Sequence, residues 1–276
     1  FKDRVVASWC NGSFLGELPK IMEAGRPAQV LWFNCMCWPF EKELAAHREG
    51  WIDAFGFVSN YQMAQLRPAL EEVRPVTVFD GYRPYFNPDN TSQRLSFMYR
   101  PPAEWFAMGR VSRDDGAKFS SDMWRIFDKV SAPRPTKAFV LGFGPNAEAK
   151  TGSAPASLDW QTWAPSGISV REFYQRLHVM IHKTGGSRES FGRIVLEAYA
   201  CGVPVIVEDD YAFPDLVVDG VTGFRCRSSD EMSYRASQLA FDEPLRRRMA
   251  YAGREFLVGT LAGLEECWRA WARVLA

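Results

Sequence analysis

Two glutamates, Glu189 and Glu197, stand eight positions apart in the stretch ESFGRIVLEAYACGVPVI, residues 189–206. The apolar run LHVMIH (177–182) and a loop containing Gly186 come directly before it, which is the order of strand, loop and helix. If the chain is helical from Glu189 onward, eight positions correspond to a rise of about 12 Å. Carboxylates at that separation can accept hydrogen bonds from hydroxyl groups at the two ends of one elongated polar ligand.

The start of this expected helix is suited to a phosphate. In open parallel sheets, ligands lie beyond the carboxyl ends of the strands and against the amino ends of the following helices. The amides of Phe191 and Gly192, together with the helix dipole, would attract an anion there. A nucleotide-sugar has the matching layout, because a diphosphate separates its sugar from its ribose. The two carboxylates could therefore accept hydrogen bonds from hydroxyls at both ends of one nucleotide-sugar.

The elements that would position these residues alternate between strand-like and helix-like patterns along the chain, which predicts parallel sheets covered on both faces. The rhythm restarts after FDGYRPYFNPDNTSQR (79–94), so we expect two α/β units. Strands are expected at 4–9, 29–34, 54–59 and 75–79, and then at 104–109, 136–143, 157–162, 177–182, 203–208 and 222–226. Helices are expected at 60–72, and then near 119–130, 169–176, 190–201, 211–217 and 228–256.

Composition limits the classes of partner. The 33 basic and 33 acidic residues of the 276-residue chain cancel, so the net charge gives no sign of nucleic acid or an anionic membrane as a bulk partner. No apolar run approaches the ~20 residues of a membrane span, and no signal-peptide pattern opens the chain at Phe1, so we expect a cytoplasmic protein. The six cysteines have no metal-ligand spacing and are expected to be reduced. The basic run 246–248 is interpreted as a solvated helix face.

The segment 189–226 resembles the Glu-x7-Glu block of retaining glycosyltransferases with the GT-B fold, above all glycosyltransferase family 4. The likeness includes the Gly-x-Pro turn at Gly202–Pro204 and the Asp-Gly-x-x-Gly-Phe turn at Asp219–Phe224. FAMGRVS (106–112) is similar to the strand that opens the family's donor domain, and VFDGYRPYFNP (78–88) resembles its hinge. The resemblance implies two Rossmann-like domains facing across a cleft and a nucleoside-diphosphate sugar as donor, with no cofactor and no metal.

The resemblance also implies roles for single residues. Glu189 would bind the donor sugar and Glu197 the ribose diol, and Arg110 matches the arginine that binds the diphosphate. The family's partner lysine has no match five residues later, where Asp115 stands, and Lys118 is the nearest substitute. We therefore expect Glu189, Arg110 and Lys118 as the catalytic residues. The expected donor-binding residues are Glu197, Ser190, Phe191, Gly192, Gly109 and Gly186.

The amino-terminal unit departs from the family. It offers fewer strands than the family's acceptor domain, so either a piece is missing or the domain is reduced. Asn34 stands where the family has an acceptor-side histidine, and it is equally well interpreted as a turn residue at a strand end. We expect this domain at 1–90 and the donor domain at 91–258. The apolar stripe in 259–276, formed by Leu261, Leu264, Trp268, Trp271 and Leu275, predicts a helix that crosses back to the first domain.

Three other functions remain open. Gly142-x-Gly144-x-x-Ala147 follows a strand and could be a dinucleotide fingerprint, but Pro145 and KTGSAPAS (150–157) are interpreted as a loop where the helix should be. Glu208, Asp209 and Asp210 could hold a metal ion in a metal-dependent sugar transferase, although such carboxylates are ordinarily helix caps. The third is a fold that binds sugar nucleotides without turnover. The sequence identifies neither the acceptor nor the base and sugar of the donor.

Overall fold

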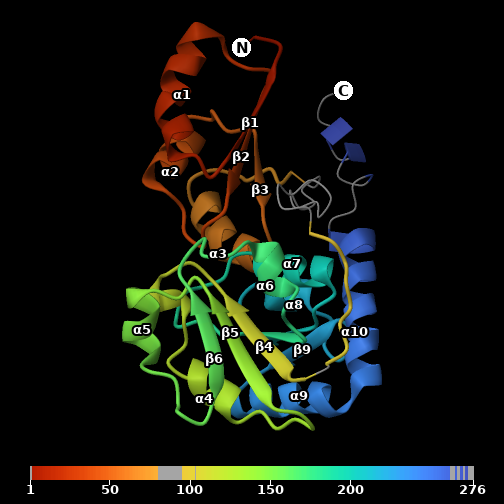
Figure 1. Cartoon of the computed structure of the whole chain (residues 1–276). Helices are drawn as coiled ribbons and strands as arrows, with labels where there is room; N and C mark the ends of the chain where they lie inside the picture. Colours follow the sequence, from red (N-terminus) through yellow and green to blue (C-terminus); the bar gives the residue numbers. More distant parts are fainter. Residues whose placement is uncertain are drawn as a thin grey trace. The chain divides into compact units, whose positions relative to one another are not determined.

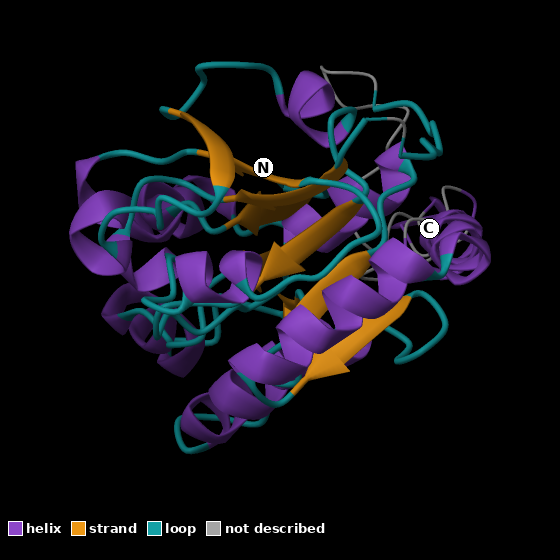
Figure 2. Ribbon diagram, turned by 60° about the horizontal axis from the view of Figure 1, so that its bottom comes forward, coloured by secondary structure: helices purple, strands orange, loops and turns teal. Residues whose placement is uncertain are grey.

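The computed structural model describes residues 2–79, 95–102 and 104–261, and also residues 265, 268, 269, 271 and 272. The strands form two parallel sheets, of three and six strands, and alternate with helices along the chain (Figures 1 and 2). This architecture confirms the α/β class. As far as they are described, Phe1–Tyr85, Glu189–Phe191 and Gly263–Ala276 form one compact unit, and Phe86–Arg188 and Gly192–Ala262 form the second. The domain limits expected at residues 90 and 258 stay predictions.

Unit 1 is built on a sheet in sequential order. Strands β1 (Val5–Trp9), β2 (Gln29–Asn34) and β3 (Ala54–Phe57) lie side by side, and helices α1 (Gly12–Gly25), α2 (Glu41–Arg48) and α3 (Asn60–Glu71) connect or follow them. The fourth strand expected at 75–79 is reduced to a bridge between Val78 and Phe55. Asn11 and Ser59 cap α1 and α3 with their side chains, as residues before a helix commonly do.

The two faces of this sheet are covered differently. Val30, Trp32 and Phe55 face a core completed by apolar residues of all three helices, including Leu18 of α1, Ala46 of α2, and Leu66 and Leu70 of α3. A sequential strand order with crossovers of one hand places α1, α2 and α3 on one face of the sheet. The other face presents Leu31, Phe33 and Phe79, and Trp271 packs there.

The carboxy-terminal residues that the structure describes are helical and differ in exposure. The ring centroid of Trp271 lies 5.6 Å from that of Trp9, 6.0 Å from that of Phe33 and 5.3 Å from that of Phe79. Trp268 of the same expected stripe is 64% exposed. Leu264 and Leu275 lie outside the described residues, as does most of the hinge-like segment 78–88.

Unit 2 holds the larger sheet, in the order β6-β5-β4-β7-β8-β9. Chain order runs outward from β4 in one direction through β5 and β6, and then returns to the other side of β4 for β7. The strand order therefore reverses between β4 and β7, and Figure 1 shows β4, β5 and β6 pointing toward one edge of the sheet. The strands are β4 (Phe106–Val111), β5 (Thr136–Leu141), β6 (Asp159–Trp163), β7 (Val179–His182), β8 (Val205–Glu208) and β9 (Gly223–Cys226).

Helices cover both faces of this sheet, as expected. Met108, Val140 and Ile181 face a core shared with α4 (Met123–Asp128) and α9 (Ser229–Phe241). On α6 (Val170–Tyr174), the hydroxyl of Tyr174 donates to the carbonyl of Ile194 at 2.9 Å and so ties α6 to α7 (Arg193–Cys201). The remaining elements of this unit are a 3₁₀ turn, η1 (Gly116–Lys118), helices α5 (Pro145–Thr151), α8 (Phe213–Leu216) and α10 (Glu243–Phe256), and a π-helical turn, η2 (Leu257–Leu261).

Three local expectations need correction. The helix after β5 does form, because Pro145 occupies the first helical position, where its fixed φ is favourable and no amide is required. The helix expected from residue 190 begins only at Arg193. The helix expected over 228–256 is two helices, since Asp242 caps the second one by accepting from the amide of Leu245 at 2.8 Å.

The basic run 246–248 is not a uniformly solvated face. Arg246 is fully buried, donates to the carbonyl of Leu239, and its guanidinium carbon lies 5.6 Å from the ring centroid of Phe106. Arg247 and Arg248 are exposed. Within the described residues, no helix is both long enough and apolar enough to cross a membrane.

Candidate functional site

Arg110 and His182 meet at the reversal of strand order in unit 2. Arg110 is the penultimate residue of β4 and His182 is the last residue of β7, and both side chains are buried at 2% exposure. Nη1 of Arg110 donates to Nδ1 of His182. Crevices beside such reversals are the usual ligand sites of open parallel sheets. The structure thus places an arginine at the position in the sheet where an anionic ligand is expected.

Lys118 joins this arrangement through its backbone. Nη2 of Arg110 donates to the carbonyl oxygen of Lys118, and the guanidinium carbon lies 4.9 Å from the ring centroid of Phe119. Lys118 ends the turn η1, which Asp115 caps by accepting from the amide of Ala117 at 3.0 Å. Asp115, which stands at the position of the family's lysine, is therefore a capping residue here, and the turn brings Lys118 toward Arg110.

The loop after β7 packs directly on this turn. The amides of Gly185 and Ser187 both donate to the carbonyl of Ala117, at 2.9 and 3.0 Å. A Cβ on Gly185 would lie 2.0 Å from the carbonyl oxygen of Phe119, so only glycine allows the loop to come this close. Gly186 has a φ of +117° and open space around its Cα, which suits a loop that bends next to a ligand. The loop is thus hydrogen-bonded to the same turn whose Lys118 carbonyl accepts from Arg110.

Gly109 has a packing role in this structure. A Cβ at this position would lie 2.4 Å from both methyl carbons of Leu177, which fills the space beside β4. Gly109 directly precedes Arg110 in the sequence, and its contact with the donor stays a prediction. The requirement for glycine is explained by the approach of Leu177.

Glu189 and Glu197 do not lie on one helix. Glu189, Ser190 and Phe191 form a loop that groups with unit 1, and α7 begins only after Gly192, whose φ is +83°. Because the chain is not helical between Glu189 and Gly192, the expected 12 Å rise along a single helix is wrong. Glu189 is half-buried, whereas Phe191 is 7% exposed.

Ser190 is held from both sides by residues of unit 1. Its hydroxyl donates to the carbonyl of Cys35 at 2.7 Å, and its carbonyl accepts from the hydroxyl of Ser59 at 2.6 Å. Its role in donor binding stays a prediction.

Glu197 is buried on the second turn of α7. Its carboxylate lies 3.1 Å from Nε of Arg193, and Tyr174 is a second polar neighbour. Burial raises the pKa of this carboxyl, and Arg193 and Tyr174 oppose that shift. A buried carboxylate needs such partners, and a ribose diol would satisfy the same oxygens.

Asn34 has a complete set of partners at the end of β2. Its side-chain amide donates to Oε2 of Glu43 at 2.9 Å and to the carbonyl of Trp38 at 3.0 Å, and its oxygen accepts from the amide of Met36 at 2.7 Å. The residue is 1% exposed. This geometry favours the interpretation as a turn residue over contact with an acceptor.

The three carboxylates at the end of β8 and directly after it have separate partners. Glu208 accepts from the amide of Thr184 at 2.8 Å, Asp209 lies 3.5 Å from Nε of Arg225, and Asp210 accepts from the amide of Tyr211 at 2.7 Å. Among the described residues, no three His, Cys, Asp or Glu side chains are grouped as metal ligands. The carboxylates thus act locally as hydrogen-bond acceptors.

The glycine-rich turn after β5 is explained by the neighbouring loop. A Cβ on Gly142 would lie 1.6 Å from the carbonyl oxygen of Ser112, and one on Gly144 would lie 2.5 Å from the carboxylate of Asp114. That carboxylate also accepts from the amide of Ala147 at 2.8 Å. It occupies the helix start that the pyrophosphate of a dinucleotide would need, so this turn does not favour a dinucleotide site.

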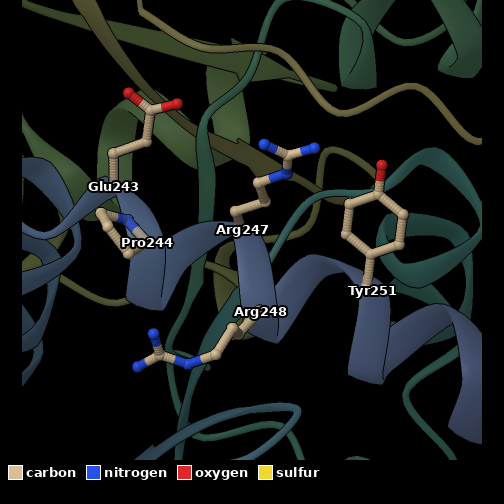
Figure 3. Close-up of a pocket in the computed structure, with 5 residues that line it drawn as sticks. All are labelled: Glu243, Pro244, Arg247, Arg248 and Tyr251. Atoms are coloured by element: carbon tan, nitrogen blue, oxygen red, sulfur yellow. The ribbon is translucent and has the colours of Figure 1, made fainter.

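A surface groove of about 550 Å³ lies along α10 (Figure 3). The described residues that line it all belong to α10, namely Glu243, Pro244, Arg247, Arg248 and Tyr251. None of the expected site residues borders it. A hollow of about 10 Å³ beside Arg110 is too small for a phosphate.

Sequence reasoning missed His182 and Glu208 as neighbours of Arg110. His178 directly precedes β7 and His182 ends it, so in an extended strand the two rings lie too far apart to share one metal ion. Nδ1 of His178 accepts from the amide of Ala107 at 2.8 Å, while His182 contacts Arg110. The position of His182 at the carboxyl end of its strand was the available signal, but its partner depends on which strands are neighbours.

Comparison with known proteins finds one family that matches part of the chain. Residues 149–256 match the family described as "Glycosyl transferases group 1". The matched segment contains Glu189, Glu197 and the loop after β7, whereas Arg110 and Lys118 precede it.

Two curated relatives are similar in sequence to part of this chain. The chain is 28% identical over 156 residues to the capsular polysaccharide biosynthesis glycosyltransferase CapM of Staphylococcus aureus, covering 54% of this chain and 39% of that protein. It is 41% identical over 70 residues to N-acetyl-alpha-D-glucosaminyl L-malate synthase of Bacillus anthracis, covering 25% of this chain and 18% of that protein. The chain thus spans less than half the length of these relatives.

The fold is similar to that of Anabaena Alr3699/HepE, whose crystal structure contains UDP-glucose. The TM-score is 0.67 at 14% identity, and the match covers 98% of this chain and 78% of the other. At this identity the likeness concerns the fold alone. Residues 149–256 are thus similar to the glycosyl transferases group 1 family, and the chain has the α/β fold of the GT-B glycosyltransferases.

Proposed function

We propose that the chain carries out retaining, metal-independent transfer of a sugar from a nucleoside-diphosphate sugar to an acceptor. The observation that carries this proposal is the position of Arg110 at the strand-order reversal, next to a β7–α7 loop that belongs to the group 1 family match. The relatives named above support it, since two are named as a glycosyltransferase and a synthase, and HepE binds UDP-glucose.

The chemistry requires stabilisation of two developing charges. The sugar passes through an oxocarbenium-like state, as in glycoside hydrolysis, while negative charge grows on the departing phosphate. A donor aimed at such a charge in a site with little water contributes roughly 3 kcal/mol to the barrier reduction. Arg110 and Lys118 supply positive charge for the diphosphate, and the backbone at Phe191 and Gly192 supplies amides.

We assign the two carboxylates, Glu189 and Glu197, to hydroxyl groups at opposite ends of the donor. Glu189 would accept from the sugar hydroxyls and Glu197 from the ribose diol. No side chain is assigned as an enzymic nucleophile, and the departing phosphate would help to remove the acceptor's proton on the same face. Arg110 is 2% exposed, so we expect the loop 183–188 to shift when the diphosphate binds.

The proposal is tested by binding and turnover together. UDP, GDP and ADP, and the corresponding glucose and N-acetylglucosamine donors, are screened by thermal shift, because a ligand at 100 times its dissociation constant stabilises by ~2.7 kcal/mol. The stabilising donor is then assayed for release of nucleoside diphosphate with and without candidate acceptors. Arg110→Ala should remove the stabilisation. Arg113→Ala is the matched control, because that arginine follows the same strand and its side chain is 71% exposed.

Each outcome has a distinct meaning. Stabilisation with release supports transfer, and stabilisation without release under any acceptor would favour a binding protein that has lost turnover. If no nucleotide or nucleotide-sugar stabilises the wild type, the proposed function is wrong.

A further inference from the structure

We propose that His182 is a positioning residue for Arg110, holding the guanidinium where it meets the diphosphate of the donor. The inference rests on the function proposed above and adds a residue to its site. His182 reaches Arg110 because β7 lies directly beside β4, with Met108 opposite Val179 and Gly109 opposite Met180.

The guanidinium of Arg110 is fixed at three points. Nη1 donates to Nδ1 of His182, Nη2 donates to the carbonyl of Lys118, and the plane lies over the ring of Phe119. The imidazole is itself held by Phe213, whose ring centroid lies 5.4 Å away in an edge-on arrangement. An arginine has several rotatable bonds, and fixing it before the donor arrives lowers the entropy cost of binding.

The hydrogen bond defines the state of the imidazole. Arginine can only donate, so Nδ1 must be the acceptor and the ring must be neutral, with its proton on Nε2. Burial lowers the pKa of His182 well below its usual value, and the neighbouring cations Arg110 and Lys118 lower it further. Glu208 on β8 also interacts electrostatically with Arg110. The neutral imidazole therefore holds the arginine without cancelling its charge.

Packing alone does not explain a histidine at this position. Nε2 of His182 is buried and has no hydrogen-bond partner among the described residues. Leaving such a group unpaired costs ~1–3 kcal/mol, whereas phenylalanine would pack against Phe213 with no such cost. What the imidazole adds is an acceptor at the Nδ1 position, and Arg110 uses it.

Three variants separate positioning from packing. His182→Asn keeps a polar atom near the Nδ1 position, His182→Gln places its amide near the Nε2 position, and His182→Phe keeps only the ring. Calorimetry measures the affinities of UDP, GDP and ADP, and the affinity of the corresponding nucleoside is measured for comparison. Steady-state kinetics gives kcat and KM with the preferred donor.

We expect His182→Phe and His182→Gln to bind the preferred nucleoside diphosphate about 10- to 100-fold more weakly, the value of one hydrogen bond to a charged group. His182→Asn should recover most of that affinity. The affinity for the nucleoside, which has no phosphate, should change less than threefold in all variants. A disturbed fold would weaken nucleoside and diphosphate alike.

The result that overturns the inference is equally specific. His182 is not a positioning residue if His182→Gln binds the diphosphate as tightly as His182→Asn, or if nucleoside binding falls in parallel. The comparison of Asn with Gln decides the question even if the phenylalanine variant does not fold. If the wild type binds no nucleoside diphosphate, the proposed function fails first, and that outcome is read from the wild type alone.

Discussion

The guanidinium of Arg193 lies 3.1 Å from the carboxylate of Glu197, one turn further along α7. Arg193 is exposed, whereas Glu197 is 9% exposed, so the pair joins a surface cation to a buried acid. Burial raises the pKa of the Glu197 carboxyl, and Arg193 favours its charged form. The arginine thus helps to keep ionised the group that we assign to the ribose.

Glu197→Ala should weaken donor binding with a smaller effect on kcat, because the ribose is far from the breaking bond. Wild type should prefer a ribonucleoside diphosphate over its 2′-deoxy analogue by roughly 10- to 100-fold, the value of a hydrogen bond to a charged group. Calorimetry on both ligands measures this preference. Arg193→Ala is the control and should retain it in large part. Equal discrimination by Glu197→Ala and wild type would remove the carboxylate from the ribose site.

Glu189→Gln should chiefly lower kcat. Its interaction with the sugar is expected to strengthen as the ring becomes oxocarbenium-like, so its loss acts on the transition state more than on the bound donor. Initial-rate kinetics over a range of donor concentrations gives the two parameters. Glu148→Gln, an exposed position on α5, is the control and should leave both unchanged. A rise in KM at constant kcat would show that Glu189 only binds the donor.

Donor turnover should persist in excess chelator. Charge stabilisation is assigned to Arg110, Lys118 and the amides near Phe191, and none of these needs an ion. Release of nucleoside diphosphate is measured after EDTA treatment and dialysis, and again with added Mn²⁺ or Mg²⁺. Loss of activity in EDTA with recovery in either ion would favour the alternative built on Glu208, Asp209 and Asp210.

Stability should fall as pH decreases from about 6.5 toward 4, in part through His178. Burial, and then Arg246 and Arg100, lower the pKa of this imidazole to about 4. Between 4 and the unfolded value of about 6.5, the unfolded chain takes up a proton that the folded chain does not, so acid favours unfolding by up to about 1.4 kcal/mol per pH unit. Urea unfolding at several pH values measures the slope.

The matched variant for this prediction is His178→Asn, which keeps an acceptor for the amide of Ala107 and cannot be protonated in this range. It should have a smaller slope than the wild type over the same interval. The pKa of His182 is also lowered, but His182 is present in both proteins. The difference between the two slopes therefore reports on His178. Identical slopes would mean that His178 titrates normally.

Trp271→Ala should destabilise unit 1 by about 1–3 kcal/mol, less than the ~3–5 kcal/mol of a fully buried aromatic residue. The side chain is half-buried against Trp9, Phe33 and Phe79, and its loss uncovers that face of the sheet. Trp268→Ala is the control, since exposed substitutions usually stay within about 0.5 kcal/mol. Denaturant unfolding of both variants is compared. A soluble, fully active truncation at residue 258 would contradict this role of the terminal segment.

Local sequence patterns predicted most strands of both sheets and the helices that follow them. The apolar runs that became β2, β5, β7 and β8 are short and bounded by polar or glycine-containing segments, and such patterns depend only on neighbouring residues. The same locality explains the errors. Pro145 and the stretch after it predict a loop, although proline is favoured at the first position of a helix. The pattern places the start of α7 too early because Gly192 adopts a left-handed conformation.

The sequence by itself determined the residue types at the site: a strand-end arginine, a glycine-containing loop and two glutamates eight positions apart. Only the tertiary structure decided which of them meet. β4 and β7 are separated by two strands and three helices in the sequence, yet pair directly in the sheet, which places His182 on Arg110. Asn34 and Asp115 received structural partners for the same reason. Hydrogen bonds act over about 3 Å, so the partner of a side chain is set by strand order and packing, which residue spacing does not encode.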